Sequence, residues 1–309
     1  MGPEGGRAES VPWPFWVSVG YLLVVLIWGT TWYGIHTQVN GTSPHIGVAL
    51  RMGAASLIFV VIGVATKQPW RLTVSQMRLV AIAGMCFFGL NYLAAYAGSQ
   101  YLTSGVVAVI LSLTVPLNLF AEWVIRGQRP NVAMIVAATL GMGGISLVFG
   151  SELENALSGG MRWWGAGVVA SSAILVAIGN VISAELMSTR LSWIVVNAFG
   201  MAIGCVVTLA WGAVAGSPWV IQPTASWLMG YAYLVLLGSV AAFGIYMKIL
   251  PTIGTTAGAY VTVLSPVLAL LVSAALEGFS IRPTTYAGVA LLLLGHTFLI
   301  RQRSRTPPA

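Results

Sequence analysis

Ten apolar segments, each long enough to cross a lipid bilayer, follow one another along the chain and constrain its fold more than any other feature. A membrane-spanning helix needs about 20 apolar residues. The segments are rich in Ala, Leu, Gly and Ser without strand-like alternation. Charged residues make up only 7% of the chain, against roughly 25% in soluble domains. The sequence therefore predicts an all-α integral membrane protein with ten transmembrane helices, at 15–36, 44–65, 76–98, 102–122, 131–150, 162–187, 192–214, 225–247, 253–276 and 281–301.

The basic residues indicate the orientation of these helices. Cytoplasmic loops of membrane proteins carry an excess of Lys and Arg. With the N-terminus in the cytoplasm, only Arg162 and Arg282 fall in outer loops, and Arg51 falls inside the second span. Both termini are therefore predicted to be cytoplasmic, with tails at 1–14 and 302–309. The eleven basic residues on the cytoplasmic side are then Arg7, Lys67, Arg71, Arg78, Arg126, Arg129, Arg190, Lys248, Arg301, Arg303 and Arg305.

Several functional classes find no support in the sequence. The net charge of +7 does not indicate nucleic-acid binding, because apolar spans separate the basic residues. Cys86 and Cys205 lie inside apolar segments, and no cluster of His or carboxylates suggests a metal site. An intramembrane serine protease would need a Gly-x-Ser-Gly site, which is absent. We expect no enzymatic activity, no metal and no other cofactor. The expected partners are the bilayer and a small-molecule substrate, and the sequence is compatible with a monomer.

The two halves of the chain share one organisation at an offset of 150 positions. Gly29 in the first span corresponds to Gly179 in the sixth, and Pro116 in the fourth corresponds to Pro266 in the ninth. Because five is odd, the second set of five spans must cross the membrane in the opposite direction. The sequence thus predicts two inverted five-helix repeats, at 15–150 and 162–301, an arrangement found in many secondary transporters.

The paired prolines suggest hinges. A proline inside a helix leaves the carbonyl four residues earlier without its usual partner. These carbonyls belong to Ser112 and Thr262, which are again 150 positions apart. Kinks at Ser112–Pro116 and Thr262–Pro266 would flank a cavity or act as hinges; packing kinks in an ordinary helix bundle are the alternative.

Several short motifs follow one another along 15–301. They are Leu26-Ile27-Trp28-Gly29, Pro44 with Arg51, Tyr101 through Pro116, Gly254 through Pro266 with Leu276-Glu277-Gly278, and the spacing of Gly288 and Gly295. Their order resembles the drug/metabolite transporter superfamily, specifically its EamA-type ten-helix exporters. The segment after the fourth span departs from that pattern, because Gly127 and Gln128 stand where an acidic residue is expected.

Within this superfamily the chain most resembles bacterial exporters of aromatic and other amino acids. The resemblance implies a central cavity formed by spans one, three, four, six, eight and nine. It also implies alternating access and efflux from the cytoplasm across the bacterial inner membrane.

Polar and aromatic side chains within the spans are candidates for substrate binding, since such groups are costly in lipid and tend to face a cavity. An asparagine amide can donate to a carboxylate and accept from an ammonium. Aromatic walls suit an apolar side chain or an ammonium. Interhelical hydrogen bonding is the alternative role for Ser, Thr and Asn. The candidates are Trp28, Thr31, Asn91, Tyr92, Tyr96, Trp163, Asn180, Ser183, Tyr246 and Tyr260.

The distribution of charge limits the substrate. Arg51 lies roughly 10 Å below the outer surface by helical rise, and we expect it to snorkel outward, bond backbone carbonyls or pair with Glu277 rather than bind substrate. A carrier of phosphate esters would need more cations at depth. The sequence therefore favours an exporter of neutral or zwitterionic amino acids, aromatic ones included, and related metabolites. A broad-specificity drug or nucleobase exporter is the alternative. With no Asp and no Glu deep in a span, facilitated export, exchange and proton antiport all stay open.

Overall fold

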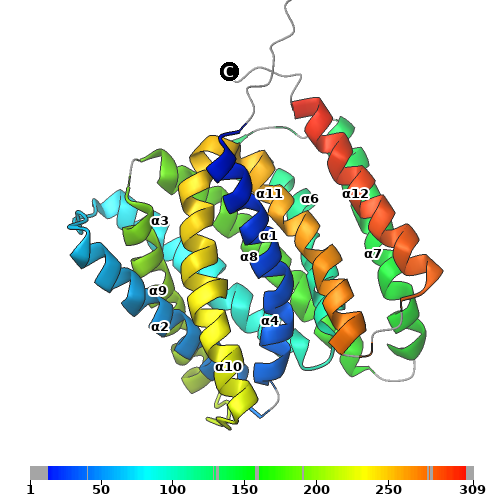
Figure 1. The fold of residues 1–309 in the computed structure, drawn as a ribbon, viewed down its shortest axis with the longest axis horizontal. Coiled ribbons are helices and arrows are strands. Elements are labelled where there is room, and N and C mark those ends of the chain that lie inside the picture. The colour runs from blue at the N-terminus through cyan, green and yellow to red at the C-terminus, as the bar shows by residue number, and fades with distance from the viewer. Residues whose placement is uncertain are drawn as a thin grey trace, which may run out of the picture.

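The computed structural model describes residues 13–303, apart from positions 40, 128, 130, 131, 157–159, 190, 277, 279 and 280. Throughout this part of the chain every regular element is a helix (Figure 1). The predicted all-α class is therefore confirmed. The elements, of which η1 and η2 are π-helices, are α1 (Phe15–Val39), α2 (Pro44–Ala65), α3 (Val74–Ala83), η1 (Gly84–Leu90), α4 (Asn91–Ser99), α5 (Ser104–Leu111), α6 (Thr114–Arg126), α7 (Val132–Ala156), α8 (Met161–Ser188), α9 (Trp193–Val214), α10 (Ala225–Tyr233), η2 (Leu234–Ala241), α11 (Ala242–Leu276) and α12 (Pro283–Arg303).

Seven helical stretches among the described residues are long and apolar enough to cross a membrane, with mean hydropathies from 1.6 to 2.2. Shorter apolar stretches lie in α7, α11 and α12. Helices suit the lipid bilayer because they pair their own backbone N–H and C=O groups, for which lipid offers no partner. The protein is thus a multi-pass membrane protein, and ten crossings stay a prediction. The seven stretches are Phe15–Val39, Pro44–Ala65, Val74–Ser99, Ser104–Arg126, Met161–Ser188, Trp193–Val214 and Ala225–Leu250.

Local sequence signals set several helix ends. α2 begins at Pro44, whose fixed φ and missing N–H suit a first helical turn. α3 follows a capping box, in which the Gln76 backbone N–H donates to Thr73 Oγ1 at 3.2 Å and the Thr73 N–H donates to Gln76 Oε1 at 2.9 Å. α6 is followed by Gly127 at φ 71°, a left-handed conformation that glycine adopts at no steric cost. Two of these signals begin a helix and one ends it, and all three lie in polar breaks between the apolar segments.

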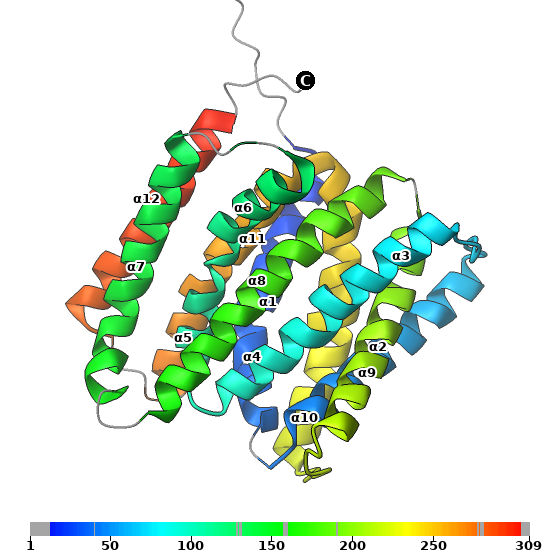
Figure 2. The ribbon, with the colours of Figure 1, turned by 180° about the vertical axis from the view of Figure 1, so that it is seen from behind.

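Two helix pairs form the flanks of the molecule. α7 packs mainly against α12 on one side and α2 packs mainly against α9 on the other (Figures 1 and 2). A Cβ added at Gly144 of α7 would lie 2.6 Å from the Gly288 carbonyl oxygen of α12. A Cβ added at Gly288 would lie 2.5 Å from the Gly144 carbonyl oxygen. Small residues permit this approach, which supplies the van der Waals contact that holds helices together in lipid.

α11 reverses direction within one continuous helical segment. The Trp28 indole N–H of α1 donates to the Gly238 carbonyl of η2 at 3.3 Å, whereas the next residue, Gly29, faces Leu268 of α11. Thirty residues of straight helix would span about 45 Å, so Gly238 and Leu268 cannot both reach α1 unless the chain turns back between them. Figure 1 shows this reversal, the yellow ribbon rising and the orange ribbon descending beside α1. Helical conformation continues through Pro251, where the sequence predicts a loop.

The two π-helices begin 150 positions apart, at Gly84 and Leu234. Each lies in the middle of a longer helical stretch, Val74–Ser99 for η1 and Ala225–Leu250 for η2. A π-helix shifts the phase of the residues that follow it and is frequent at functional sites. The offset equals that of the sequence matches between the two halves.

The helix that contains Pro116 is interrupted at Ser112 and Leu113, between α5 and α6. The Ser112 carbonyl accepts from the Val115 N–H at 3.2 Å, and the Ser112 hydroxyl donates to the Val109 carbonyl at 2.6 Å. These bonds satisfy the backbone where the proline cannot. The break thus lies one turn before Pro116, at the residue that the sequence singles out.

The corresponding segment around Pro266 differs. α11 continues through Pro266 without interruption, and the side chain of Thr262 lies outside the described residues. The two prolines therefore do not break their helices alike. Their use as hinges stays a prediction.

Candidate functional site

A cavity of about 90 Å³, here called the central cavity, lies between α1, η1, α4, α5, α6, α8 and α11. Six of the ten substrate-binding candidates line it, and they come from four helices. These six are Trp28, Thr31, Asn91, Tyr92, Asn180 and Tyr246. The other lining residues are Trp32, Ile35, Phe87, Ala108, Leu111, Thr114, Val176, Phe243 and Ser265.

Aromatic rings in mutual contact form one wall of the central cavity. The Trp28 ring lies 5.0 Å from that of Phe243 in an edge-to-face arrangement and 5.1 Å from that of Tyr246. The Phe87 ring meets Phe243 at 5.6 Å, also edge to face. Such pairs hold each ring in a fixed orientation. The wall presents a rigid apolar surface suited to a flat or apolar group.

The polar groups of the central cavity differ in whether they already form hydrogen bonds within the protein. The Asn91 amide donates to the Phe87 carbonyl and its Oδ1 accepts from Ser172 Oγ at 3.3 Å, so Asn91 joins α4 to α8 as well as lining the cavity. Within the described part of the chain, the Asn180 amide and the Tyr246 hydroxyl make no hydrogen bond. Unpaired polar groups at an apolar cavity are available to a ligand. Asn180 and Tyr246 are therefore the better-placed candidates.

The remaining four candidates lie elsewhere. Tyr96 is fully buried and donates its hydroxyl to Gln38 Oε1 at 3.0 Å. Trp163 is 44% exposed near the beginning of α8, and Ser183 is buried further along that helix. The side chain of Tyr260 lies outside the described residues. Neither Tyr96, Trp163 nor Ser183 lines the central cavity, so their assignment to the substrate stays a prediction.

Sequence reasoning missed Phe87 and Phe243. Phe87 lies in η1, and Phe243 follows η2 by two residues. The sequence does not show whether a phenylalanine in a membrane helix faces the protein interior or the outer surface. Phe120 of α6, for example, is 55% exposed. The phase shift of a π-helix also defeats counting by regular helical spacing. Only the packing identifies these two rings as part of the wall.

Arg51 lies directly behind the wall of the central cavity. Its side chain is 1% exposed, so the expectation that it snorkels outward is wrong. Nε donates to Ser239 Oγ at 2.9 Å, and the guanidinium lies over the Tyr92 ring at 4.6 Å. The expected partner Glu277 lies outside the described residues. The observed acceptor is thus the hydroxyl of Ser239, where the sequence analysis expects backbone carbonyls.

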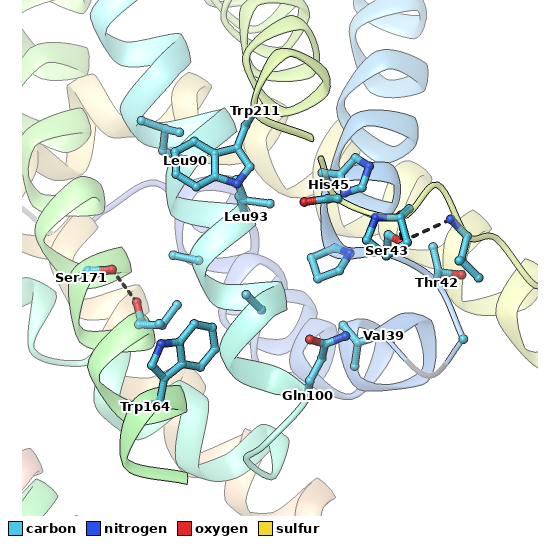
Figure 3. Close-up of a pocket in the computed structure, with 18 of the residues that line it drawn as sticks. Val39, Thr42, Ser43, His45, Leu90, Leu93, Gln100, Trp164, Ser171 and Trp211 are labelled. Atoms are coloured by element: carbon cyan, nitrogen blue, oxygen red, sulfur yellow. Dashed lines mark hydrogen bonds between the residues drawn. The ribbon is translucent and has the colours of Figure 1, made fainter. Parts of the chain in front are cut away.

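A second, larger pocket of about 730 Å³ lies between α4, α8, α9 and the beginning of α2 (Figure 3). Its apolar floor includes Leu90 and Leu93, and Trp164 and Trp211 project into it from α8 and α9. The 217–220 segment closes one end, where Ser43 N–H donates to the Val220 carbonyl at 3.0 Å. None of the ten candidates lines this pocket.

An ion pair joins α6 to α8 away from both pockets. Arg126 Nη2 lies 3.0 Å from Glu185 Oε2, and the two side chains are 29% and 52% exposed. Both residues stand in the last turn of their helices, on the side that the sequence predicts to be cytoplasmic. The pair links one helix from each half of the chain.

Known proteins share this sequence pattern and fold. The chain is 24% identical over 272 residues to the uncharacterized inner membrane transporter YedA of Escherichia coli K12, covering 87% of this chain and 85% of that protein. It is 25% identical over 263 residues to the uncharacterized transporter YoaV of Bacillus subtilis, covering 82% and 86%. A crystal structure with 17% identity has the same fold, with a TM-score of 0.67 and coverage of 94% and 99%.

The family comparison covers nearly the whole chain. The model of the EamA-like transporter family matches twice, at residues 15–150 and at residues 163–301. The two matches include every helix that lines the central cavity. This chain belongs to the EamA-like transporter family of membrane transporters, within the drug/metabolite transporter superfamily.

Proposed function

We propose that this transporter exports neutral or zwitterionic amino acids, aromatic ones included, and related small metabolites from the cytoplasm across a bacterial inner membrane. The observation that carries the proposal is the central cavity, which an aromatic wall lines together with the Asn180 amide and the Tyr246 hydroxyl, two groups without a hydrogen-bond partner among the described residues. An apolar side chain fits against the rings, and the amide can bond either charged end of an amino acid.

The volume of the cavity supports a transport cycle with more than one conformation. At about 90 Å³ it is smaller than the roughly 300–1,000 Å³ of typical ligand pockets. A substrate of amino-acid size therefore needs a wider cavity than this conformation offers. Alternating access supplies such a conformation by moving one group of helices against the other around a fixed site.

The proposed topology is ten helices in two inverted repeats, at 15–150 and 162–301, with both termini in the cytoplasm. The equal offsets of η1 and η2 and of the paired residues support a repeat. The beginning of α1 and the end of α12 lie at the same end of the molecule (Figure 1), as an even number of crossings requires. The asymmetry of basic residues supports the orientation.

Transport by purified protein in liposomes tests the function. Labelled phenylalanine, tryptophan, leucine, a nucleoside and a cationic dye are loaded inside, and their efflux is compared with that from protein-free liposomes. We expect efflux of the amino acids. Export of the dye or the nucleoside without any amino acid would instead establish the broad-specificity drug or nucleobase exporter. Repeating the assay with an imposed pH gradient distinguishes proton antiport from facilitated export.

A further inference from the structure

We propose that Arg51 binds the carboxylate of the transported solute, which reaches the guanidinium when Tyr92 moves off it. This inference rests on the proposed function and names the group by which the substrate is held. The proposed site has two parts. A carboxylate subsite lies behind the central cavity, and the other walls of the cavity contact the rest of the solute.

The first observation is a buried charge that has no counter-ion among the described residues. Arg51 is 1% exposed and forms no ion pair with any carboxylate among the described residues. An isolated charge in a dry interior is costly and is normally paired. The contacts present, to the Ser239 hydroxyl and the Tyr92 ring, are a neutral acceptor and a π-face. They hold the guanidinium in place, but neither carries a negative charge to balance it.

The second observation is a pair of unused donors in the same polar cluster. Among the described residues, Arg51 Nη1 and Gln38 Nε2 are both buried without a hydrogen-bond partner, while Gln38 Oε1 accepts from the Tyr96 hydroxyl at 3.0 Å. Tyr96 follows Tyr92 by one turn of α4, and the guanidinium lies over the Tyr92 ring. Two buried donors without an acceptor indicate that the group completing this cluster is an acceptor, and beside a guanidinium the favoured acceptor is a carboxylate.

The third observation is the position of the guanidinium relative to the cavity. Tyr92, which lines the central cavity, covers one face of it. A Cβ added at Gly238 would lie 3.2 Å from Arg51 Nη2 and 2.7 Å from the Cγ2 atom of Thr31, a second lining residue. Tyr92 and Thr31 thus lie near both the charge and the cavity. In the proposed binding step the Tyr92 ring rotates and exposes the guanidinium to the cavity.

The geometry explains how one site can orient a zwitterion. With its carboxylate at Arg51, the solute extends toward the aromatic wall of Phe87, Phe243 and Tyr246. The Asn180 amide oxygen is then available to the ammonium. In the empty state the cation–π contact with Tyr92 shields the charge. The carboxylate replaces that contact on binding.

Competition with matched solutes tests the subsite. The wild-type protein in liposomes is assayed for transport of labelled L-phenylalanine, and unlabelled L-phenylalanine is compared with L-phenylalaninamide as competitor. A charge-assisted hydrogen bond predicts that the acid competes about tenfold or more better than the amide. In Arg51→Gln this ratio is expected to fall close to one, and in Arg51→Lys to stay above that of Arg51→Gln. Arg126→Gln is the matched control and is expected to retain the wild-type ratio.

The outcomes separate the two proposals. If wild-type protein exports phenylalanine but the amide competes equally well, or if Arg51→Gln retains the full preference, the carboxylate subsite is wrong and the export function stands. If wild-type protein exports no amino acid, both proposals are wrong. Should Arg51→Gln fail to fold, the wild-type ratio and Arg51→Lys decide the question.

Discussion

The indole N–H of Trp28 donates to the backbone carbonyl of Gly238 at 3.3 Å, across 210 positions of sequence. The donor lies in α1 and the acceptor in the π-helix η2. The indole thus donates a hydrogen bond to a carbonyl of a π-helix, in which the backbone hydrogen-bond pattern differs from that of a regular α-helix. This contact fixes the ring that anchors the aromatic wall and ties the first half of the chain to the second.

Trp28→Phe keeps an aromatic ring but removes this bond together with part of the indole. We expect a loss in the free energy of unfolding that exceeds that of the control below by about 0.5–1.5 kcal/mol, the contribution of the bond, measured by denaturation in detergent, and slower export. Trp32→Phe is the control, because its indole also lines the cavity but makes no hydrogen bond to another described residue. Equal losses in both variants would show that the bond to Gly238 contributes nothing.

Gly288→Ala should weaken the packing of α12 against α7. The added Cβ would lie 2.5 Å from the Gly144 carbonyl oxygen, and a backbone atom cannot move aside as a side chain can. We expect destabilisation of about 1–3 kcal/mol, visible as a lower melting temperature in detergent. In Gly141→Ala the added Cβ meets nothing within 4 Å. That variant should be as stable as the wild type or slightly more stable, by up to about 1 kcal/mol from helix propensity.

Tyr246→Phe removes a hydroxyl that has no partner among the described residues and leaves the ring in the wall. We expect a melting temperature close to that of the wild type. The KM for an exported amino acid should rise about threefold to tenfold, as for the loss of one hydrogen bond to the substrate. The same KM as in the wild type would exclude the hydroxyl from the substrate site.

The ion pair between Arg126 and Glu185 should contribute little to stability. Both side chains are partly exposed, and such pairs contribute about 0–1 kcal/mol. A double-mutant cycle of Arg126→Gln and Glu185→Gln measures the coupling. We expect it to be below about 1 kcal/mol and to fall further at high salt. A coupling of several kcal/mol would mean that the pair is shielded from solvent.

Cysteine labelling tests the proposed orientation. Ser188→Cys, at the end of α8, and Ala215→Cys, directly after α9, place exposed thiols on either side of the α9 span, in a background with Cys86→Ser and Cys205→Ser. With both termini cytoplasmic, a membrane-impermeant maleimide added to whole spheroplasts should label position 215 and spare position 188. Labelling of position 188 alone would reverse the topology.

The sequence identifies some of the residues that line the central cavity and misses others, for one physical reason. Trp28, Asn180 and Tyr246 stand out because polar or amphipathic groups are costly in lipid unless they face a cavity. Phe87 and Phe243 do not stand out, because a phenylalanine is equally soluble in lipid and in a protein interior. Their place in the wall depends on helix contacts far apart in the chain.

For Arg51, too, the sequence shows one part of the answer and only the structure shows the other. Its presence inside the second span is evident from the sequence, and so is the need for some compensation of its charge. Outward snorkelling, bonds to backbone carbonyls and a pair with Glu277 are all compatible with the sequence, since it does not show which groups surround the guanidinium. The structure instead buries the guanidinium between Ser239 and Tyr92, from η2 and α4.

The sequence by itself determined the membrane class and the approximate positions of the helices, and it predicts two similar halves. These follow from local quantities, namely the length of apolar runs, the turn residues between them and the scarcity of charge. Only the tertiary structure decided which face of each helix lines the central cavity, how α11 turns back on itself, and that Arg51 lies behind Tyr92. In lipid the outer surface of a helix is as apolar as its packed face, so hydrophobic periodicity cannot tell the two apart. The π-helices η1 and η2 then shift the register of the residues that follow them.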